Sequence, residues 1–358
     1  MNNGSLVPIM NRSIDALFTA NLTAQEAPID PVLICWKVLT GIFCLFGALS
    51  NVFVLIVLIK SPTLRRGAGL LIAHLLTCHV FMCSIGQPVY IHFVWAHASN
   101  NPNPDNSNFC PYYAPFLVTI GILVNWSEAA LAFNRFVAVF FPTKYVVLNR
   151  TIVHYSVLFV CWSCTLAVSL PPALGAFGSY ELTSLGTCGV HYTLSTSVAF
   201  GLTFLNSYVP LIILTAGTVI ILAKFTATHF GQSTAIIRPQ LEQNAAGPPA
   251  ARTSERRKRA SRMLLASFVL SLACQFPLNV VVLTGTQFRF PKETLWIRTL
   301  STLEFAITPI LFLTMNRDYH DKALALIRQW TCVQPSGQPP LVLLTGKSQS
   351  PSNLIYEG

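Results

Sequence analysis

Four ionisable side chains interrupt long apolar stretches of this sequence. Arg135 lies in AFNRFVAVFFP (132–142), His79 lies in LLIAHLLTCHVF, and Glu128 and Glu304 lie in two further apolar stretches. A charged group in apolar surroundings is costly, so such side chains pair, exchange a proton or reach toward water. The chemistry that these four residues offer is therefore ion pairing and proton exchange.

Catalysis by these four residues would need further chemical groups close to them. The sequence shows no nucleophile grouped with a base, no phosphate-binding glycine loop and no cysteine or histidine spacing typical of a metal site. The pattern thus favours a protein that is not an enzyme and that needs no cofactor or metal.

The elements that position these residues are long apolar segments. The 358-residue chain is 53% hydrophobic and only 10% charged, whereas a soluble domain carries about a quarter charged residues. A transmembrane helix needs roughly 20 mostly apolar residues, and seven segments qualify: 33–59, 68–94, 111–141, 152–176, 196–224, 262–285 and 295–315. We therefore predict an all-α membrane protein, a bundle of seven transmembrane helices.

The basic residues predict how this bundle is oriented. The connections after the first, third and fifth segments, together with the tail after the seventh, hold 18 Lys and Arg residues, and the rest of the chain holds five. Basic connections stay in the cytoplasm, so we expect an extracellular N-terminus. The net charge of +10 then reflects membrane topology, and a nucleic-acid partner is not expected.

These boundaries divide the chain into a membrane domain with a tail at each end. We expect an extracellular tail at 1–31, a seven-helix domain at 32–315 and a cytoplasmic tail at 333–358, with a flexible cytoplasmic loop at 225–260. The extracellular tail has three glycosylation acceptor motifs, at Asn3, Asn11 and Asn21.

The segment 316–332 has its apolar residues on roughly one face. This pattern predicts a short amphipathic helix on the membrane surface, in contact with lipids. Cys332 at its end is a candidate for palmitoylation, and the alternative is a free cytosolic thiol.

Several motifs occur in the order and spacing of one family. They are Gly47 and Asn51 in the first segment, Cys110 and Asn134-Arg135-Phe136 with Pro142 around the third, Trp162 and the Pro171-Pro172 pair in the fourth, Cys188 after it, Pro210 in the fifth, Cys274-Gln275-Phe276-Pro277 in the sixth, and Thr308-Pro309-Ile310-Leu311-Phe312 with Tyr319 in and after the seventh. Through them the chain resembles the rhodopsin-like (class A) G-protein-coupled receptors over about 33–332.

The resemblance assigns roles to several of these residues. It implies that Arg135 is part of a cytoplasmic switch, packing against a helix of a heterotrimeric G protein. The alternative is a plain topology anchor that reaches water. The resemblance also implies a disulfide between Cys110 and Cys188, which an oxidising compartment permits.

The chain departs from the family at its switch positions. Asn134 replaces the usual Asp, Gln275 replaces Trp, and Thr308 and Phe312 replace Asn and Tyr, while Pro277 and Pro309 are present. We expect the fold to survive these changes. Arg135 lacks its usual carboxylate restraint, which predicts a looser inactive state. The replacements at Gln275, Thr308 and Phe312 remove polar contacts that lock the active state in the family, which leaves efficient coupling in doubt.

The family comparison also places the other ionisable residues in one layer. His79 stands where the family has a sodium-organising Asp, Glu304 stands where it has Asn, and Glu128 lies two turns above Arg135. With Asn51, they form the expected polar core layer. One interpretation is a proton-sensitive switch without a conventional sodium site, in which His79 can pair with a glutamate. The other is a neutral hydrogen-bonded cluster that specifies packing.

The resemblance places the ligand between the outer halves of the third, fifth, sixth and seventh helices. Leu117 in place of an Asp argues against a biogenic amine, and Thr302 in place of the retinal lysine argues against a photoreceptor. Arg298 can bind a carboxylate or phosphate there, or it can reach outward to the interface. The expected ligand-site residues are Tyr90, Leu117, Gly121, Phe204, Gln275, Asn279 and Arg298.

Together these patterns predict a plasma-membrane receptor that couples an extracellular ligand to a heterotrimeric G protein. An anionic lipid or small acid is the favoured ligand class, with a peptide left open. Arrestin and a receptor kinase are further possible partners. The alternative is an atypical seven-helix receptor with weak or no G-protein coupling, and a transporter or channel is a third.

Overall fold

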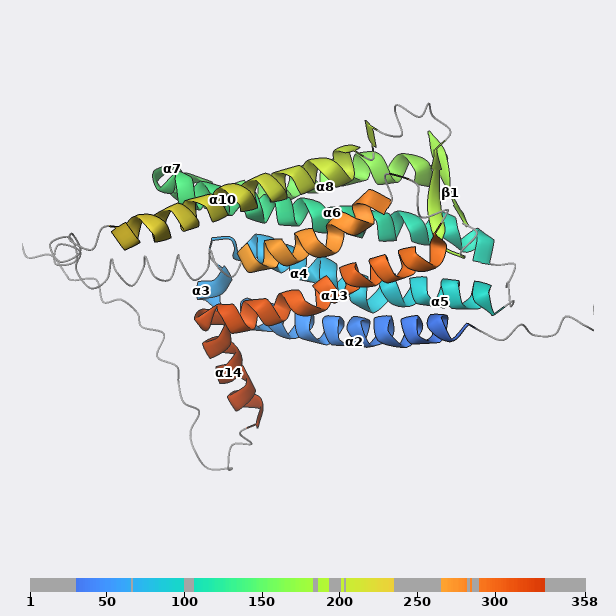
Figure 1. Ribbon diagram of the computed structural model, residues 1–358, viewed down its shortest axis with the longest axis horizontal. Coiled ribbons are helices and arrows are strands. Elements are labelled where there is room, and N and C mark those ends of the chain that lie inside the picture. Colours follow the sequence, from blue (N-terminus) through green and yellow to red (C-terminus); the bar gives the residue numbers. More distant parts are fainter. Residues whose placement is uncertain are drawn as a thin grey trace, which may run out of the picture.

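The computed structural model describes residues 30–99, 106–182, 186–192, 201–234, 265–284 and 290–331, apart from residues 66, 203, 282 and 283. Long helices run roughly side by side along the molecule (Figure 1). In chain order, the long elements are α2 (Pro31–Lys60), α4 (Gly69–Phe81) continued by η1 (Met82–Gly86) and α5 (Gln87–Ala98), α6 (Asn106–Phe140), α8 (Thr151–Ala173), η2 (Phe204–Tyr208) continued by α10 (Val209–Thr234), an unlabelled helix at Leu265–Val281, and α13 (Pro291–Met315).

These helices confirm the predicted fold class. Six of them are long and apolar enough to cross a membrane, and Leu265–Val281, called helix six below, is a shorter apolar helix. Two short helices, α3 (Pro62–Arg65) and α7 (Pro142–Leu148), connect the long ones.

Local sequence explains where the first helix begins. Asp30 caps α2 by accepting a hydrogen bond from the backbone N–H of Val32 at 2.9 Å, and Pro31 occupies the first helical turn, where no backbone donor is needed. The helix ends at Lys60, and Ser61 is already extended.

The outer face of the first helix is apolar, unlike the outer face of a helix in a soluble protein. On α2, Val38, Ile42, Leu45 and Leu49 are each more than half exposed and follow a helical spacing, whereas Asn51 is fully buried. An apolar outer face suits lipid, and polar groups inside must find partners within the bundle.

The fifth and the second helices differ from the predicted segments in ways that matter for the fold. The fifth continues to Thr234, ten residues beyond the predicted end at 224, so the predicted loop at 225–260 begins with helix. The second contains the π-helical turn η1 just before Pro88. A proline removes a backbone donor and crowds the preceding turn, so a local change of helical pitch there is expected.

A polar seam joins the first helix to the seventh. Pro309 in α13 has no N–H for the carbonyl oxygen of Phe305, four residues earlier. The side-chain amide of Asn51 on α2 donates to that oxygen at 2.7 Å. Nearer the other end, Trp36 Nε1 donates to the carbonyl oxygen of Leu295 at 3.2 Å. The carbonyl group freed by Pro309 is thus satisfied by a hydrogen bond between α2 and α13.

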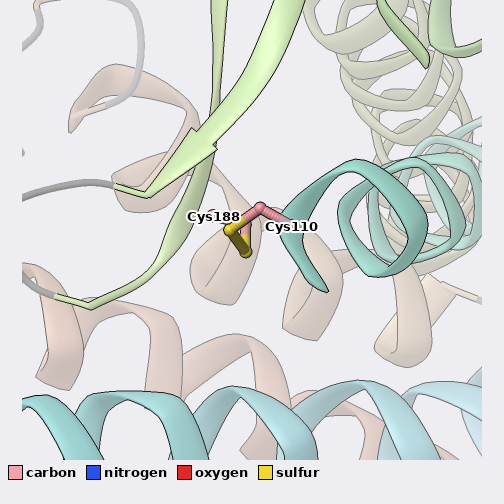
Figure 2. Close-up of a disulfide and its surroundings, with 2 residues drawn as sticks. All are labelled: Cys110 and Cys188. Carbon is pink, nitrogen blue, oxygen red and sulfur yellow. A yellow bond between two sulfur atoms is a disulfide. The ribbon is translucent and has the colours of Figure 1, made fainter. Parts of the chain in front are cut away.

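A β-hairpin covers one end of the bundle, where the sequence predicted only a loop. Strands β1 (Gly178–Leu182) and β2 (Cys188–Tyr192) pair antiparallel, with Leu182 opposite Cys188. Cys188 is bonded to Cys110 near the start of α6, as Figure 2 shows, with a sulfur–sulfur distance of 2.01 Å. We call this the disulfide end, and the end that holds Arg135 the arginine end.

The helix after the seventh, α14 (Arg317–Thr331), turns away from the bundle axis (Figure 1). Its apolar face divides into two parts. Tyr319, Ala323 and Leu326 are buried against the bundle, whereas Ile327 and Trp330 are exposed. Buried anchors beside exposed apolar side chains are what a helix lying at a membrane surface requires.

Candidate functional site

At the disulfide end, a cation faces the interior of the bundle. Arg298 on α13 places its guanidinium carbon 4.4 Å from the centre of the Tyr90 ring on α5, a cation–π contact. The side chain therefore turns toward the second helix and is half-buried. Nearby, the hydroxyl of Tyr113 donates to the carbonyl oxygen of Gly86, which ties α6 to the π-helical turn.

Four other expected ligand residues, Leu117, Gly121, Phe204 and Asn279, lie on the third, fifth and sixth helices. Phe204 stacks on Tyr208 with ring centres 5.8 Å apart, and the Tyr208 hydroxyl donates to the carbonyl oxygen of Asn279 at 2.7 Å. Leu117 packs against Gly86, and no heavy atom occupies the space beside Gly121. The fifth and sixth helices are thus joined at the same end as Arg298.

Gln275 is placed differently from the other ligand-site candidates. Its side chain is buried and its amide nitrogen donates to Glu304 Oε2 at 2.8 Å. Its amide oxygen accepts from Ser301 at 3.3 Å. The position that the sequence assigned to ligand contact is therefore held by a polar network inside the bundle.

This acidic network consists of Glu128 on α6, Ser271 and Gln275 on helix six, and Glu304 and Ser301 on α13. The hydroxyl oxygen of Ser271 lies within hydrogen-bonding distance of both carboxyl groups. Glu128 is 2% exposed and Glu304 is fully buried. Three helices therefore meet at one polar point that water does not reach.

His79 differs from the sequence-based expectation. It is fully buried, but neither ring nitrogen has a hydrogen-bond partner, and the ring lies against Phe305 at 4.7 Å between centres. The suggested pairing of His79 with a glutamate is not formed. The physical reason is that Phe305, the neighbour of Glu304 on α13, occupies the position facing the imidazole.

Two polar features of the interior were missed from the sequence. One is Ser271, which precedes Gln275 by one helical turn and so shares its face. The other is His74, whose Nδ1 lies 2.8 Å from the Ser127 hydroxyl and whose Nε2 accepts from Trp162 at 3.0 Å. Since Trp Nε1 only donates, the proton of His74 is on Nδ1. Polar residues spaced by about one helical turn within apolar segments were the sequence signal that could have revealed these features.

At the arginine end, Arg135 is half-buried and its Nε has no acceptor. Within the part of the chain that the structure describes, no carboxylate forms an ion pair with it. Its neighbour Asn134 turns instead to α8, with its amide nitrogen 3.3 Å from His154 Nε2. The family's acidic partner is thus replaced by a contact between the third and fourth helices.

The remaining switch candidates line the same end. Phe136 stacks on Phe140, with ring centres 4.9 Å apart, and Pro142 begins α7. Phe312 is fully buried, 6.1 Å between ring centres from Tyr319 on α14. Burial raises the pKa of the Tyr319 phenol, although the nearby charge of Arg135 acts in the opposite direction, so this hydroxyl is a neutral donor.

Thr308 and Pro277, two further residues of the helical motifs, lie within α13 and helix six. The Thr308 hydroxyl donates to the carbonyl oxygen of Glu304 at 2.9 Å, within α13. Pro277 lies in helix six and is half-buried.

Among the described residues, no three His, Cys, Asp or Glu side chains come together as a metal site would require. Asn3, Asn11, Asn21 and Cys332 lie outside the described residues.

The helical bundle, its proline-containing helices and the disulfide to the third helix define a receptor class. This chain belongs to the rhodopsin family of seven-transmembrane receptors: the family profile, described as "7 transmembrane receptor (rhodopsin family)", matches residues 50–313. Members of this family are receptors and not enzymes.

One relative is the Neuropeptide F receptor of Drosophila melanogaster. It is 23% identical to this chain over 148 residues, which cover 40% of this chain and 29% of the relative. The match spans less than a third of that receptor's length, so it supports the class of protein rather than a shared ligand.

Proposed function

We propose that this chain is a plasma-membrane receptor that binds a carboxylate-bearing ligand at its disulfide end and activates a heterotrimeric G protein at its arginine end. In this proposal the N-terminus is extracellular. The excess of Lys and Arg in the connections at the arginine end supports that orientation, because basic connections remain in the cytoplasm.

The observation that carries the coupling proposal is that Arg135 has no acceptor for its Nε and no ion-pair partner among the described residues. A guanidinium has five N–H donors and is charged at all physiological pH values. Here its Nε is buried without an acceptor, and no described carboxylate restrains it. A protein segment that brings carbonyl or carboxylate oxygens to this end would supply the missing acceptors.

The observation that supports the ligand class is the inward position of Arg298. A guanidinium on an aromatic ring keeps its edge donors available for a planar carboxylate. A small acid, an anionic lipid and a peptide with an acidic group all carry this chemistry. The relative's name refers to a neuropeptide, which makes a peptide a reasonable member of this set.

The first experiment is ligand-free G-protein activation in cells, measured across a panel of G-protein subtypes. We expect basal activation by the wild-type chain, and we expect Arg135→Ala to abolish it at matched surface expression. Arg150→Ala is the control, because Arg150 is an exposed cation at the same end. Equal signals from wild type and Arg135→Ala would contradict the proposal.

A second candidate function is an atypical receptor that couples weakly and acts through arrestin. Thr308 and Phe312 favour it, because among the described residues the Thr308 hydroxyl bonds only within its own helix and the buried Phe312 has no hydroxyl, so the polar contacts of the family at these positions are missing. Arrestin recruitment in the absence of any G-protein signal would select this function.

A further inference from the structure

We infer that Glu128 carries a proton in the centre of the bundle, and that this proton locks helix six to the third and seventh helices. This inference goes beyond the proposed coupling, because it concerns the charge state and stability of the acidic network. It depends on three observations: where the two carboxyl groups lie, how many hydrogen atoms are available between them, and what surrounds them.

The first observation is that the two carboxyl groups are buried at one point. Glu128 comes from α6, Glu304 from α13, and both contact the same Ser271 hydroxyl oxygen of helix six. Like charges in such contact within a low-dielectric interior cannot both be present, so at least one carboxyl is neutral.

The second observation is a count of hydrogen atoms. Ser271 has a single hydroxyl hydrogen, and an ionised carboxylate can only accept. One of its two carboxyl contacts is therefore made by a hydrogen that the carboxyl itself supplies. Without that proton, the oxygen of Ser271 would face one carboxylate with no hydrogen between them.

The hydrogen-bond partners decide which carboxyl supplies it. Glu304 Oε2 already accepts from the amide nitrogen of Gln275 at 2.8 Å, and its Oε1 is placed to accept from Ser271. Glu128 has no donor other than Ser271 among the described residues, and its carboxyl also forms a hydrogen bond with the carboxyl of Glu304. A hydrogen bond between two carboxyl groups needs a proton on one of them. The consistent order is therefore a protonated Glu128 donating to its acceptors, while Ser271 and Gln275 donate to Glu304.

The third observation is what surrounds the pair. Cys274 on helix six lies within electrostatic reach of both carboxyls, and His79 on α4 lies against Phe305 without contacting them. Among the described residues, no Lys, Arg or His forms an ion pair with either glutamate. No cation is therefore in place to hold a second negative charge.

A pH dependence follows, and its sign is fixed. The folded bundle holds a proton that a solvent-exposed glutamate would have lost at neutral pH, so raising the pH disfavours the bundle. One such proton changes the folding equilibrium by up to about tenfold per pH unit. A glutamine at position 128 is neutral, can still donate to Ser271 and has no proton to lose.

The test uses the full chain purified in lipid nanodiscs. Infrared spectroscopy at neutral pH should show the C=O stretch of a protonated carboxyl in the wild type, absent in Glu128→Gln and retained in Glu304→Gln. Glu293→Gln is the matched control, because Glu293 is exposed on the same helix as Glu304. Thermal unfolding from mildly acidic to mildly alkaline pH should lose stability in the wild type and change less in Glu128→Gln.

Several results would overturn the inference. They are the absence of the protonated band in the wild type, its loss in Glu304→Gln but not in Glu128→Gln, and equal pH slopes in all variants. If Glu128→Gln does not accumulate, Ser271→Ala replaces it and should shift the band by removing its acceptor. The infrared readout needs no G protein, so its failure is distinct from a failure of coupling.

Discussion

At the scale of single residues, the cost of burying charge accounts for the contacts of the ionisable side chains in the bundle. Arg298 rests on an aromatic ring, Glu304 accepts from Gln275, and His79 lies against Phe305 with no hydrogen-bond partner. The first two contacts lower the cost of a polar group in the membrane in different ways, whereas the ring nitrogens of His79 remain without compensation. In the proposed function, the charge that binds a ligand is that of Arg298.

Replacing Arg298 should weaken ligands that carry a carboxylate. We would screen small carboxylic acids, fatty acids and acidic peptides with the basal-coupling assay, together with the amide form of each active compound. A charged hydrogen bond contributes about 1.5–3 kcal/mol, so Arg298→Gln should reduce potency by about ten- to a hundredfold. The amide forms should lose activity similarly on the wild type.

The matched control for this prediction is Lys37→Gln. Lys37 also lies over an aromatic ring, with its nitrogen 3.7 Å from the centre of Trp95, but between the first and second helices. Potency should be unchanged in this variant. An active acid with equal potency on wild type and Arg298→Gln would exclude Arg298 as its anchor.

At the scale of elements, the β-hairpin at the disulfide end depends on close backbone approach. Gly186 in its turn has φ of +72°, and a Cβ there would lie 2.4 Å from the Cβ of His97 on α5 and 3.0 Å from the carbonyl oxygen of Phe93. Only glycine adopts this positive φ without strain and has no Cβ to clash with His97 and Phe93. Gly186 is therefore held against the second helix, while the disulfide holds β2 to the third.

We predict that Gly186→Ala destabilises the protein through this turn. The left-handed backbone alone costs an L-residue about 1–2 kcal/mol, and the clash with His97 adds to it. Gly175→Ala is the control, since Gly175 has φ of +74° but open space around it. Thermal unfolding of the purified proteins should show a clearly larger loss for Gly186→Ala. Equal losses would mean that the close approach contributes nothing.

At the scale of the whole molecule, the orientation in the membrane sets which end meets the ligand. The described helices give two distinct ends, one with the hairpin and disulfide and one with Arg135, α7 and α14 (Figure 1). Disulfides persist in oxidising compartments, which agrees with an extracellular disulfide end. The charge bias of the connections leads to the same orientation.

Epitope tags placed before residue 1 and after residue 358 test this orientation. An antibody should detect the first tag on intact cells and the second only after the membrane is permeabilised. The reverse result would place Arg135 outside the cell and remove the basis for coupling. A chain with both tags on one side would contradict an odd number of membrane crossings.

The sequence alone predicted the fold class, because apolar segments of sufficient length dictate membrane helices wherever they pack. The family relation was also predictable, since it depends on motif order. The hairpin was not, because neither strand has a strong local pattern. The extension of α10 to Thr234 was missed because 225–234 is too polar to be counted as membrane helix.

Only the tertiary structure decided which polar residues meet. That Ser271 joins Glu128 to Glu304, and that Phe305 rather than a glutamate faces His79, depends on the rotation and depth of separate helices. The hydrogen bond from Asn51 to the carbonyl group freed by Pro309 also depends on the rotation and depth of these helices. Sequence spacing fixes neighbours within one helix, but contacts between helices arise from packing against the rest of the bundle.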